Sequence, residues 1–462
     1  MTNQIENDFD FDAAVQTDPR LKKIFAAVAA NRRLQDINET LIDHAALEEA
    51  VSSLVEVTRS DDVALRRADT AEVCVREGVR KVGQATMQTW AILQAERADA
   101  RARAEHPSLR KNQKKKLYWS TTLGEITVIE QTYRKGSGPT RPFSQSANVR
   151  CRMWSLPLLR LAIDLAADEA FGKAVLKSKE HHCIDLSEST LQRRCREIGE
   201  EIAAMKVPPG LRVENQKAII AQMDGSMVPI TEPNPDDPRH PFRFWREVRL
   251  AVAFVPGEDW KIYGGGTIDG GVPAAGEALR RCVTRAGFCE SSHVYGMGDG
   301  ASWIADQFQR QFGYQQSYLV DLYHVCVYLA AAAAAFAATA HKQASWVLKQ
   351  KERLKNGELD KVLRTVKSAI EPEDVADENA PVRKCDRYFK NRPGQFEYLD
   401  AINNDRPVGS GVVESGNKSV VGGRMKKPGA AWRVKNAESM IAIRICRANA
   451  GWGDFWDAKM AA

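Results

Sequence analysis

The sequence predicts a mixed α/β fold in which a strand-rich region is interrupted by a long helical segment. Short apolar runs typical of buried strands alternate with amphipathic helical segments between residues 218 and 322. No strand pattern occurs over 325–398, and residues before 105 follow a helical pattern. These changes of pattern predict four regions: 1–110, 111–207, 208–324 together with 400–462, and a helical insertion over 325–399.

Composition is that of a folded protein without a membrane span. Of the 462 residues, 44% are hydrophobic and 27% are charged, which is ordinary for a globular protein. No run of about 18 apolar residues occurs. The N-terminus is acidic without an apolar segment, and the nine cysteines form no Cys-x-x-Cys pair. We therefore expect no secretory signal, free thiols and a cytoplasmic location.

The net charge of +6 is concentrated in two segments. Residues 111–160 hold ten Lys or Arg against two Glu, and residues 381–462 hold fifteen against eight Asp or Glu. Local basic segments on a nearly neutral chain are typical of proteins that bind a polyanion, most often nucleic acid. The alternative is that these lysines and arginines are ordinary solvated surface residues.

The N-terminal half predicts helices, a hairpin and a second set of helices. Helical spacing covers 45–57 and 61–104, and residues 117–133 alternate around Leu123 and Gly124 as in a β-hairpin. Further helices are expected over 156–170 and after Ser187, a candidate N-cap. If this pair is a helix-turn-helix, its second helix would place three side chains in the major groove: Gln192, Arg193 and Arg194. An ordinary helix pair would have the same pattern.

The strand-rich region follows a recognisable order. Strands are expected over 218–223, 247–255 and 262–268, then a helix over 274–286, a strand over 294–297, a helix over 302–312 and a strand over 317–322. Two helices, over 414–425 and 437–448, follow the insertion. This succession is that of a ribonuclease H-like mixed sheet.

Three acidic residues occupy the positions where such a sheet carries its carboxylates. Asp224 ends the first strand, Asp299 ends the fourth, and Glu414 lies at a helix start. Each aspartate alone would fit an ordinary turn, since Asp followed by Gly is common there. Together, the three carboxylates predict a site for Mg²⁺ or Mn²⁺, because hard oxygen ligands suit these ions.

Six ordered sequence blocks resemble one protein family. They are Met223-Asp224-Gly225, Trp245-Arg246-Glu247-Val248, the block from Gly298 to Ile304, Asp321-Leu322-Tyr323-His324, the block from Gly409 to Ser415, and the tail from Gly422 to Trp432. Over about residues 117–456 the chain is similar to the bacterial insertion-sequence transposases of the IS-Kra-four family, a Mutator-like branch of the DDE transposases.

The resemblance implies a catalytic triad of Asp224, Asp299 and Glu414 that holds two divalent metal ions. The separation of 115 positions between Asp299 and Glu414 implies a helical insertion, as in related transposases. Asp321 and His324 match an acid-x-x-His motif. Asp321 would tune the metal site or orient His324, or the two would form a buried structural pair.

The C-terminal basic segment, 424–435, is expected to follow the DNA backbone beside the catalytic glutamate. Its candidate DNA-binding residues are Arg424, Lys426, Lys427, Trp432 and Arg433. Trp432 would either pack or stack on an unpaired base. The alternative for the cations is a solvated helix end.

The remaining conspicuous residues have structural interpretations. Trp245 and Trp303 are expected to be packing residues, and Cys282 and Cys289 core thiols. His181, His182 and Cys183 resemble half of a metal site, but no second half is spaced to complete it.

We therefore expect a DNA transposase that binds its element's terminal inverted repeats and target DNA as a homodimer or larger synaptic assembly, in the nucleoid. The expected reaction is metal-dependent cleavage followed by strand transfer. Two alternatives are open: a structure-selective nuclease on the same fold, and a non-catalytic DNA-binding regulator derived from a transposase.

Overall fold

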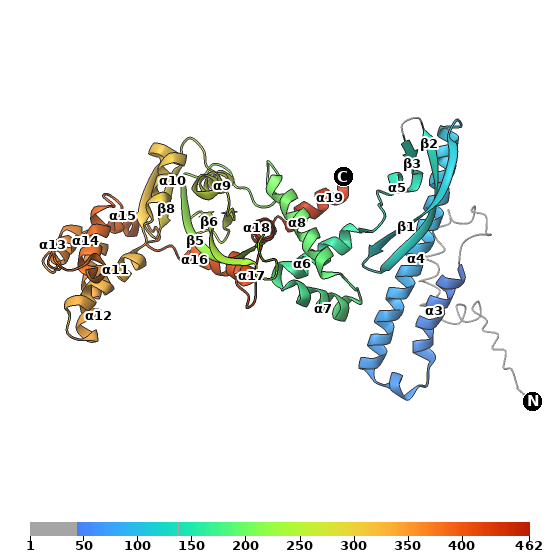
Figure 1. Cartoon of the computed structure of the whole chain (residues 1–462), viewed down its shortest axis with the longest axis horizontal. Helices are drawn as coiled ribbons and strands as arrows, with labels where there is room; N and C mark the ends of the chain where they lie inside the picture. The colour runs from blue at the N-terminus through green and yellow to red at the C-terminus, as the bar shows by residue number, and fades with distance from the viewer. Residues whose placement is uncertain (1–43, 136–137) are drawn as a thin grey trace, which may run out of the picture. The chain divides into compact units, whose positions relative to one another are not determined.

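The computed structural model describes residues 44–135 and 138–462, and the chain divides after Trp154 into two compact units (Figure 1). We call them unit 1, up to Trp154, and unit 2, from Ser155. The division falls inside the region 111–207 expected from the sequence, because the helices after Trp154 pack on the C-terminal helices of unit 2.

Unit 1 combines long helices with a four-stranded sheet of order β3-β2-β1-β4. The expected helices and hairpin are present, and the two strands of the hairpin extend beyond the expected range of 117–133. The elements are α3 (His44–Arg59), η2 (Val63–Arg66), α4 (Ala68–Glu105), β1 (Arg110–Thr121), β2 (Gly124–Lys135), β3 (Gly138–Thr140), α5 (Pro142–Ser146) and β4 (Met153–Trp154).

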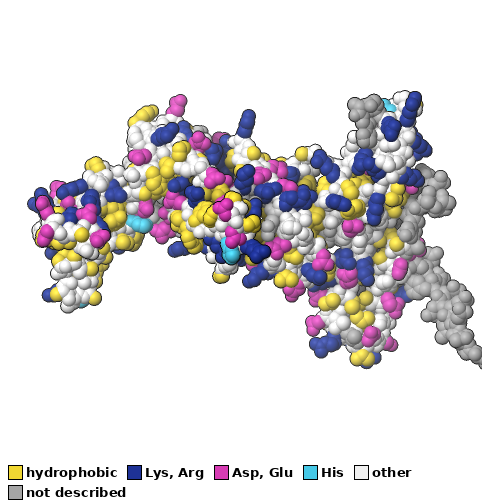
Figure 2. Space-filling view, in the orientation of Figure 1, with side chains coloured by type: hydrophobic (Ala, Val, Ile, Leu, Met, Phe, Trp, Pro, Cys, Tyr) yellow, Lys and Arg dark blue, Asp and Glu magenta, His cyan; other side chains and the backbone are white. Residues whose placement is uncertain are grey.

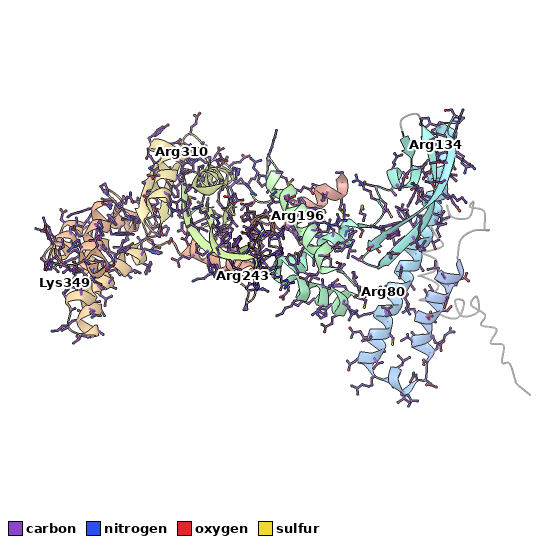
Figure 3. The ribbon with its side chains drawn as sticks, viewed as in Figure 1. Arg80, Arg134, Arg196, Arg243, Arg310 and Lys349 are labelled. Atoms are coloured by element: carbon purple, nitrogen blue, oxygen red, sulfur yellow. The ribbon has the colours of Figure 1, made fainter. Side chains whose placement is uncertain are left out.

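One face of this sheet forms the core of unit 1. Alternate residues of the hairpin, among them Leu117, Trp119 and Ile126, are buried with Ala91 of α4. Helix α4 also closes the exposed edge of β2, since Gln88 Oε1 accepts a hydrogen bond of 3.0 Å from Thr127 N. Arg80, labelled in Figure 3, donates to the Leu123 carbonyl at 3.0 Å. These contacts leave the opposite face of the hairpin without a partner in the described part of unit 1.

Unit 2 contains a five-stranded sheet of order β7-β6-β5-β8-β9. The first three strands in sequence are antiparallel neighbours, and β8 and β9 are parallel to β5. This order and these directions are those of a ribonuclease H-like sheet, as the sequence predicts. The strands are β5 (Ala218–Glu232), β6 (Phe242–Phe254), β7 (Ile262–Gly265), β8 (His293–Gly298) and β9 (Gln316–Val320).

Helices cover both faces of this sheet (Figure 1). On one face, α9 (Gly271–Arg285) and α10 (Ser302–Phe312) bury Leu279 and Phe308 against β5 residues such as Ile219. On the other face, α16 (Gly411–Gly416) packs Val413 against Leu250 of β6. β7 is shorter than the expected 262–268 because Gly265 takes a left-handed φ of 110° and ends the pairing with β6.

The segment between β9 and α16 is helical, as expected, and no strand occurs in it. It has its own apolar core, which includes Leu329, Val366 and Phe389. Its elements are α11 (Leu322–Phe336), α12 (Ala340–Lys355), α13 (Leu359–Lys367), η4 (Asp377–Asn379), α14 (Pro381–Lys390) and α15 (Tyr398–Asn403).

The helices at the start and end of unit 2 pack on one another. A Cβ added to Gly199 of α8 would lie 2.3 Å from the Ser439 carbonyl oxygen of α18, so only glycine permits this close helix crossing. These helices are α6 (Leu156–Asp168), α7 (Phe171–His182), α8 (Glu188–Ala204), α17 (Gly423–Met425), α18 (Val434–Ala448) and α19 (Trp452–Ala461).

Positive and negative side chains are interspersed on the surface of each unit (Figure 2). Within the described residues, no helix combines the length and the apolar character that crossing a membrane would require. The cysteines from Cys74 onward are all free thiols.

Candidate active site

Asp224 and Asp299 lie at the same level on two paired central strands. The last residue pair of the β5–β8 ladder is Gln222 and Met297, and each aspartate follows its strand's member of that pair by two residues. Because β5 and β8 are parallel, both aspartates lie just beyond the point where these two strands stop pairing; β8 ends there, whereas β5 continues to Glu232 beside β6, so Asp224 does not end its strand as the sequence predicts. The two predicted aspartates are thus brought together by strand register.

The carboxylate of Asp224 is held by two donors. Gly225 N donates to Oδ1 and Asn417 Nδ2 donates to Oδ2, each at 2.8 Å. Burial raises the pKa of Asp224; the hydrogen bonds from Asn417 and Gly225 oppose this rise, and the negative charge of Asp299 adds to it. The His324 ring also lowers the pKa, which places Asp299 and His324 within electrostatic range of Asp224.

A buried glutamine fixes the helix that carries Glu414. Gln222 of β5 is fully buried, donates from Nε2 to the Gly409 carbonyl at 3.3 Å and accepts from Val413 N at 3.0 Å. The amide side chain therefore binds the backbone on both sides of the start of α16. Glu414 follows immediately, in the first turn of that helix and half-buried.

A π-helical turn follows α16 and carries Asn417. The turn spans Asn417–Gly422 and runs directly into α17. π-turns inside helices frequently occur at functional sites. Here the turn begins at the residue whose amide holds Asp224, so one continuous helical segment carries both Glu414 and the partner of the first aspartate.

Asp321 connects the insertion to the helix of Glu414. Its Oδ1 caps α11 by accepting from Tyr323 N at 2.6 Å and from His324 N at 3.2 Å. Its Oδ2 accepts from Ser410 N at 2.6 Å and from the Ser410 hydroxyl. The side chain is only 1% exposed. All four of these hydrogen bonds are structural, so Asp321 positions its neighbours.

His324 and Glu414 lie beside Asp321, close enough to share an ion. One possible ligand atom from each of these three residues lies within 4.8 Å of the other two. Asp224 and Asp299 are not members of this group, and His324 acts on Asp224 only through its charge, which lowers the pKa of Asp224. The donor set of carboxylates with one imidazole suits a hard divalent cation. The Asn417 side chain, whose Nδ2 donates to Asp224, has a buried Oδ1 without a hydrogen-bond partner in the described chain.

The helical insertion between β9 and α16 also forms hydrogen bonds to the turn that carries Asp299. Tyr388 of α14 donates its hydroxyl to the Asp299 carbonyl at 2.8 Å, and Arg392 Nε donates to the Gly300 carbonyl at 2.6 Å. Gly300 has a left-handed φ of 88°, and an added Cβ would lie 2.5 Å from the Tyr388 hydroxyl. The turn therefore requires glycine, and its shape depends on the insertion.

The three predicted DNA-binding residues of α8 lie on its first turns, after Ser187 at the N-cap position. Gln192 donates to Glu188 at 3.1 Å, and Arg194 forms an ion pair of 2.8 Å with Glu197. Arg193 is exposed and has no ion pair in the described chain. Of the three, only Arg193 offers an uncompensated charge to a ligand.

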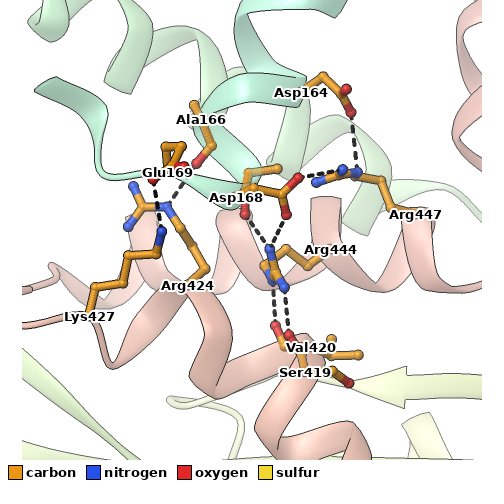
Figure 4. Close-up of polar contacts among 11 residues, drawn as sticks. Asp164, Ala166, Asp168, Glu169, Ser419, Val420, Arg424, Lys427, Arg444 and Arg447 are labelled. Carbon is orange, nitrogen blue, oxygen red and sulfur yellow. Dashed lines mark hydrogen bonds and ion pairs between the residues drawn. The ribbon is translucent and has the colours of Figure 1, made fainter. Parts of the chain in front are cut away.

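The C-terminal segment differs from its sequence prediction at Arg424 (Figure 4), whereas Trp432 packs, which is one of its two expected roles. Arg424 is 2% exposed and donates from Nε to the Ala166 carbonyl at 2.8 Å. Its guanidinium lies 4.6 Å from the ring centre of Trp432, which is itself 4% exposed and donates its indole N–H to the Met425 carbonyl. In this structure neither side chain can reach DNA, because both are buried inside unit 2.

Other cations of this segment are neutralised within unit 2 (Figure 4). Lys427 pairs with Glu169 at 3.0 Å, and Arg444 and Arg447 both pair with Asp168. Burial lowers the pKa of Arg424 to about 10. By contrast, Lys426 and Arg433 are exposed and have no ion pair among the described residues.

Two further expectations need correction. Trp245 is 60% exposed, because the β5–β6 hairpin extends beyond the helices that cover the sheet, so it is not a packing residue. Cys289 is half-buried in a loop with Ser291 and Ser292, outside the core. Cys282 is a buried core thiol and Trp303 packs at the core margin, both as expected.

The sequence analysis did not identify several residues that orient Asp224, Asp299 and Glu414. Gln222 left a signal, since it is a polar residue inside an apolar strand. Asn417 lies three residues after Glu414, on the same side of a helix, which was a second usable signal. No sequence pattern marks Tyr388 and Arg392, because their contacts are with a turn about ninety positions away in the sequence.

Comparison with known proteins identifies no family for this chain. No protein-family model matches it, and a search of curated proteins found no significant match. Among solved structures, the chain is similar to a Drosophila P element transposase strand transfer complex at 11% identity and a TM-score of 0.25. That match covers 69% of this chain and 84% of the other. The fold assignment rests on the strand order and directions, not on this similarity.

Proposed function

We propose that the protein is a DDE-type DNA transposase. It would bind the terminal inverted repeats of its element, hydrolyse a phosphodiester bond to free a 3′ hydroxyl, and direct that hydroxyl to target DNA. One observation carries the proposal: two aspartates at the same level on paired strands of a ribonuclease H-like sheet, with Glu414 on a helix fixed to the same sheet. The resemblance of the six sequence blocks supports the same activity.

Asp224, Asp299 and Glu414 would hold Mg²⁺ or Mn²⁺, two ions in all. When bound, such ions activate an attacking oxygen and stabilise a leaving oxygen at phosphorus. The protein's own residues orient the ligands: Asn417 holds Asp224, Tyr388 shapes the turn of Asp299, and Gln222 fixes the helix of Glu414. Asp321 and His324 would support the site from beside Glu414.

DNA and a second copy of the chain are the proposed partners. Lys426, Arg433 and Arg193 are exposed cations of unit 2 without ion pairs in the described chain, and they are candidates for phosphate contacts. For self-association, α4 exposes Val75 at 40% and Val79 at 56%, one helical turn apart on the same side, which a second helix would cover.

The test is cleavage of a duplex that carries an element end, with the full chain and Mg²⁺ or Mn²⁺. We expect Asp224→Asn, Asp299→Asn and Glu414→Gln each to lower the cleavage rate by about a thousandfold or more, with DNA affinity nearly unchanged. Asp306→Asn is the matched control, because this exposed aspartate of α10 lies outside the cluster.

The outcomes separate the proposal from its alternatives. Cleavage by Asp224→Asn at the wild-type rate would overturn the triad. Equal cutting of branched DNA with and without element ends would indicate a structure-selective nuclease. DNA binding without cleavage over a full metal titration would indicate a non-catalytic regulator.

Asn417 provides a finer test of the cluster. Asn417→Ala removes the donor to Asp224 Oδ2, so we expect the Mg²⁺ concentration for half-maximal cleavage to rise about tenfold, with the maximal rate largely restored at high Mg²⁺. A Mn²⁺-dependent rise in melting temperature should need correspondingly more metal. Asn436→Ala on α18 is the control. An unchanged metal requirement would show that Asn417 only packs.

A further inference from the structure

The stem of the β1–β2 hairpin carries an uncompensated group of cations that we call the hairpin cation cluster. Figure 2 shows Lys and Arg side chains gathered over this part of unit 1, and Arg134 is labelled in Figure 3. The cluster lies at the open end of the hairpin, away from the turn at Leu123. Its members are Arg110, Lys111, Lys114, Lys115, Lys116 and Arg134.

No carboxylate neutralises this cluster in the described part of the chain. None of its members forms an ion pair there. The one acidic residue opposite them in the ladder is Glu130, the partner of Lys115. Glu130 points inward, is 2% exposed, and accepts hydrogen bonds from the backbone N and the hydroxyl of Ser144. Five members of the cluster are exposed, and Lys115, which shares the face of Glu130, is half-buried, so most of the cluster's charge is directed outward.

The ladder also places two of these cations against each other. Arg110 lies directly opposite Arg134 across the antiparallel pair. Like charges in that position oppose strand pairing. A fold that needed these residues only for solubility would gain nothing from this arrangement, whereas an external polyanion would relieve the repulsion.

The cations follow an open surface of the sheet. Tyr118 lies between the buried Leu117 and Trp119, and Lys116 and Lys114 precede it at alternate positions, so the three share the face of β1 opposite to these buried residues. Along a strand, such residues are about 6.6 Å apart. The edge of β1 is open as well, since β4 pairs only with Trp119 and Ser120. A linear array of cations on an open strand fits a linear polyanion.

We infer that the hairpin cation cluster is a second DNA contact of the protein, which binds the phosphate backbone of duplex DNA without reading its sequence. Duplex DNA carries one negative charge per about 1.7 Å of its axis, and each neutralised phosphate releases counterions. This inference rests on the proposed function, which requires a DNA partner. It assigns to unit 1 a holding role separate from the catalytic cluster of unit 2.

A competing explanation is protection of the strand edge. Lysines on an exposed edge strand prevent pairing with other chains. That explanation predicts self-association when the lysines are removed, and no change in DNA affinity. The two explanations therefore give opposite results in one set of measurements.

The test is fluorescence anisotropy with the full chain and a labelled duplex of arbitrary sequence, at 50–300 mM KCl and without divalent metal. For the double variant Lys114→Gln/Lys116→Gln, we expect the slope of log affinity against log salt to decrease by about 1.8, or 0.9 per lost contact, and the affinity at 0.1 M salt to fall by tens of fold. Lys114→Arg/Lys116→Arg should bind like the wild type.

The matched control is Lys342→Gln/Lys349→Gln, which removes the same charge from exposed positions of α12 (Lys349 is labelled in Figure 3). It should leave the salt slope unchanged. If both double variants weakened DNA binding equally, the loss would depend only on the net charge of the protein, and the inference would be overturned. Unchanged affinity together with self-association of Lys114→Gln/Lys116→Gln in sedimentation would also overturn it, as would preferential displacement by single-stranded RNA.

Failure of this inference is distinguishable from failure of the proposed function. If the wild type binds duplex DNA and both double variants bind equally well, only the cluster is misassigned. If the wild type binds no duplex DNA in this salt range, the transposase proposal fails as well.

Discussion

The two basic segments of the chain have similar charge in the sequence and opposite roles in the structure. Residues 111–160 carry a surplus of eight cations and residues 381–462 a surplus of seven. In the hairpin, Lys114 and Lys116 remain exposed and unpaired within the described chain. In the C-terminal segment, Arg424 is buried and Lys427 is paired with Glu169.

The difference lies in where the opposing groups come from. Arg424 and Lys427 contact the end of α6 and the residue that follows it, 258 positions earlier in the chain. These cations join the first helices of unit 2 to its last ones. A charge count along the sequence cannot separate a cation that holds the fold together from one that awaits a ligand, because the deciding partner is distant in sequence.

The largest expected effect concerns Arg424. Arg424→Ala removes a buried side chain, its hydrogen bond to Ala166 and its contacts with the rings of Phe171 and Trp432. We expect the free energy of unfolding to fall by about 3 kcal/mol in urea titrations. The neighbouring change Lys426→Gln should alter it by less than about 0.5 kcal/mol. Similar values for both variants would erase the contrast between buried and exposed cations.

A smaller effect concerns pH. Hydrogen bonds from Lys177 and then Lys427 lower the pKa of Glu169 to about 2, from an ordinary value of 4.5. Because the folded-state pKa is lowered, the stabilisation is complete above about pH 4.5 and is lost as the pH falls toward 2.

The side chain of Glu169 is 23% exposed, so solvent screening limits the contribution to about 1 kcal/mol. Urea titrations of wild type and Glu169→Gln between pH 2 and 6 should differ by that amount at pH 6, and the difference should shrink steadily as the pH falls toward 2. A difference that stays constant with pH would contradict the assigned ion pairs.

The smallest expected effect sharpens the other side of the comparison. Arg134→Gln removes the like-charge pair with Arg110, so unit 1 should become more stable by about 0.3 kcal/mol at low salt. The gain should vanish in 1 M salt. Arg110→Gln should give the same gain and the double variant no further gain, which a double-mutant cycle would measure. Destabilisation by either single change would mean that these arginines have a structural role.

The sequence was sufficient to predict the sheet and the positions of its acids. Strand order and the place of Asp299 after its strand follow from local patterns, but the expected end of the first strand at 223 is wrong, because β5 stays paired with β6 through Glu232 and Asp224 lies within that ladder, opposite Leu250. The insertion was predictable for the same reason, because helical spacing persists over many residues. That Glu414 joins the aspartates in one site was implied only by family resemblance and remains a prediction.

Contacts between distant segments could not be predicted. Nothing near Arg424 in the sequence indicates that the Ala166 carbonyl would receive its N–H, and nothing near Trp245 indicates that the hairpin would extend beyond its covering helices. The π-turn at Asn417 likewise packs against both β5 and α18, contacts that helical periodicity does not encode.

The four hydrogen bonds of Asp321 couple the position of the helical insertion to the position of Glu414. One carboxylate oxygen holds the start of α11 and the other holds Ser410, four residues before Glu414. A tilt of α11 must therefore either carry the glutamate with it or break bonds inside a nearly dry interior. A ligand that displaces the insertion would therefore also shift the carboxylate of Glu414, without a separate loop to transmit the movement.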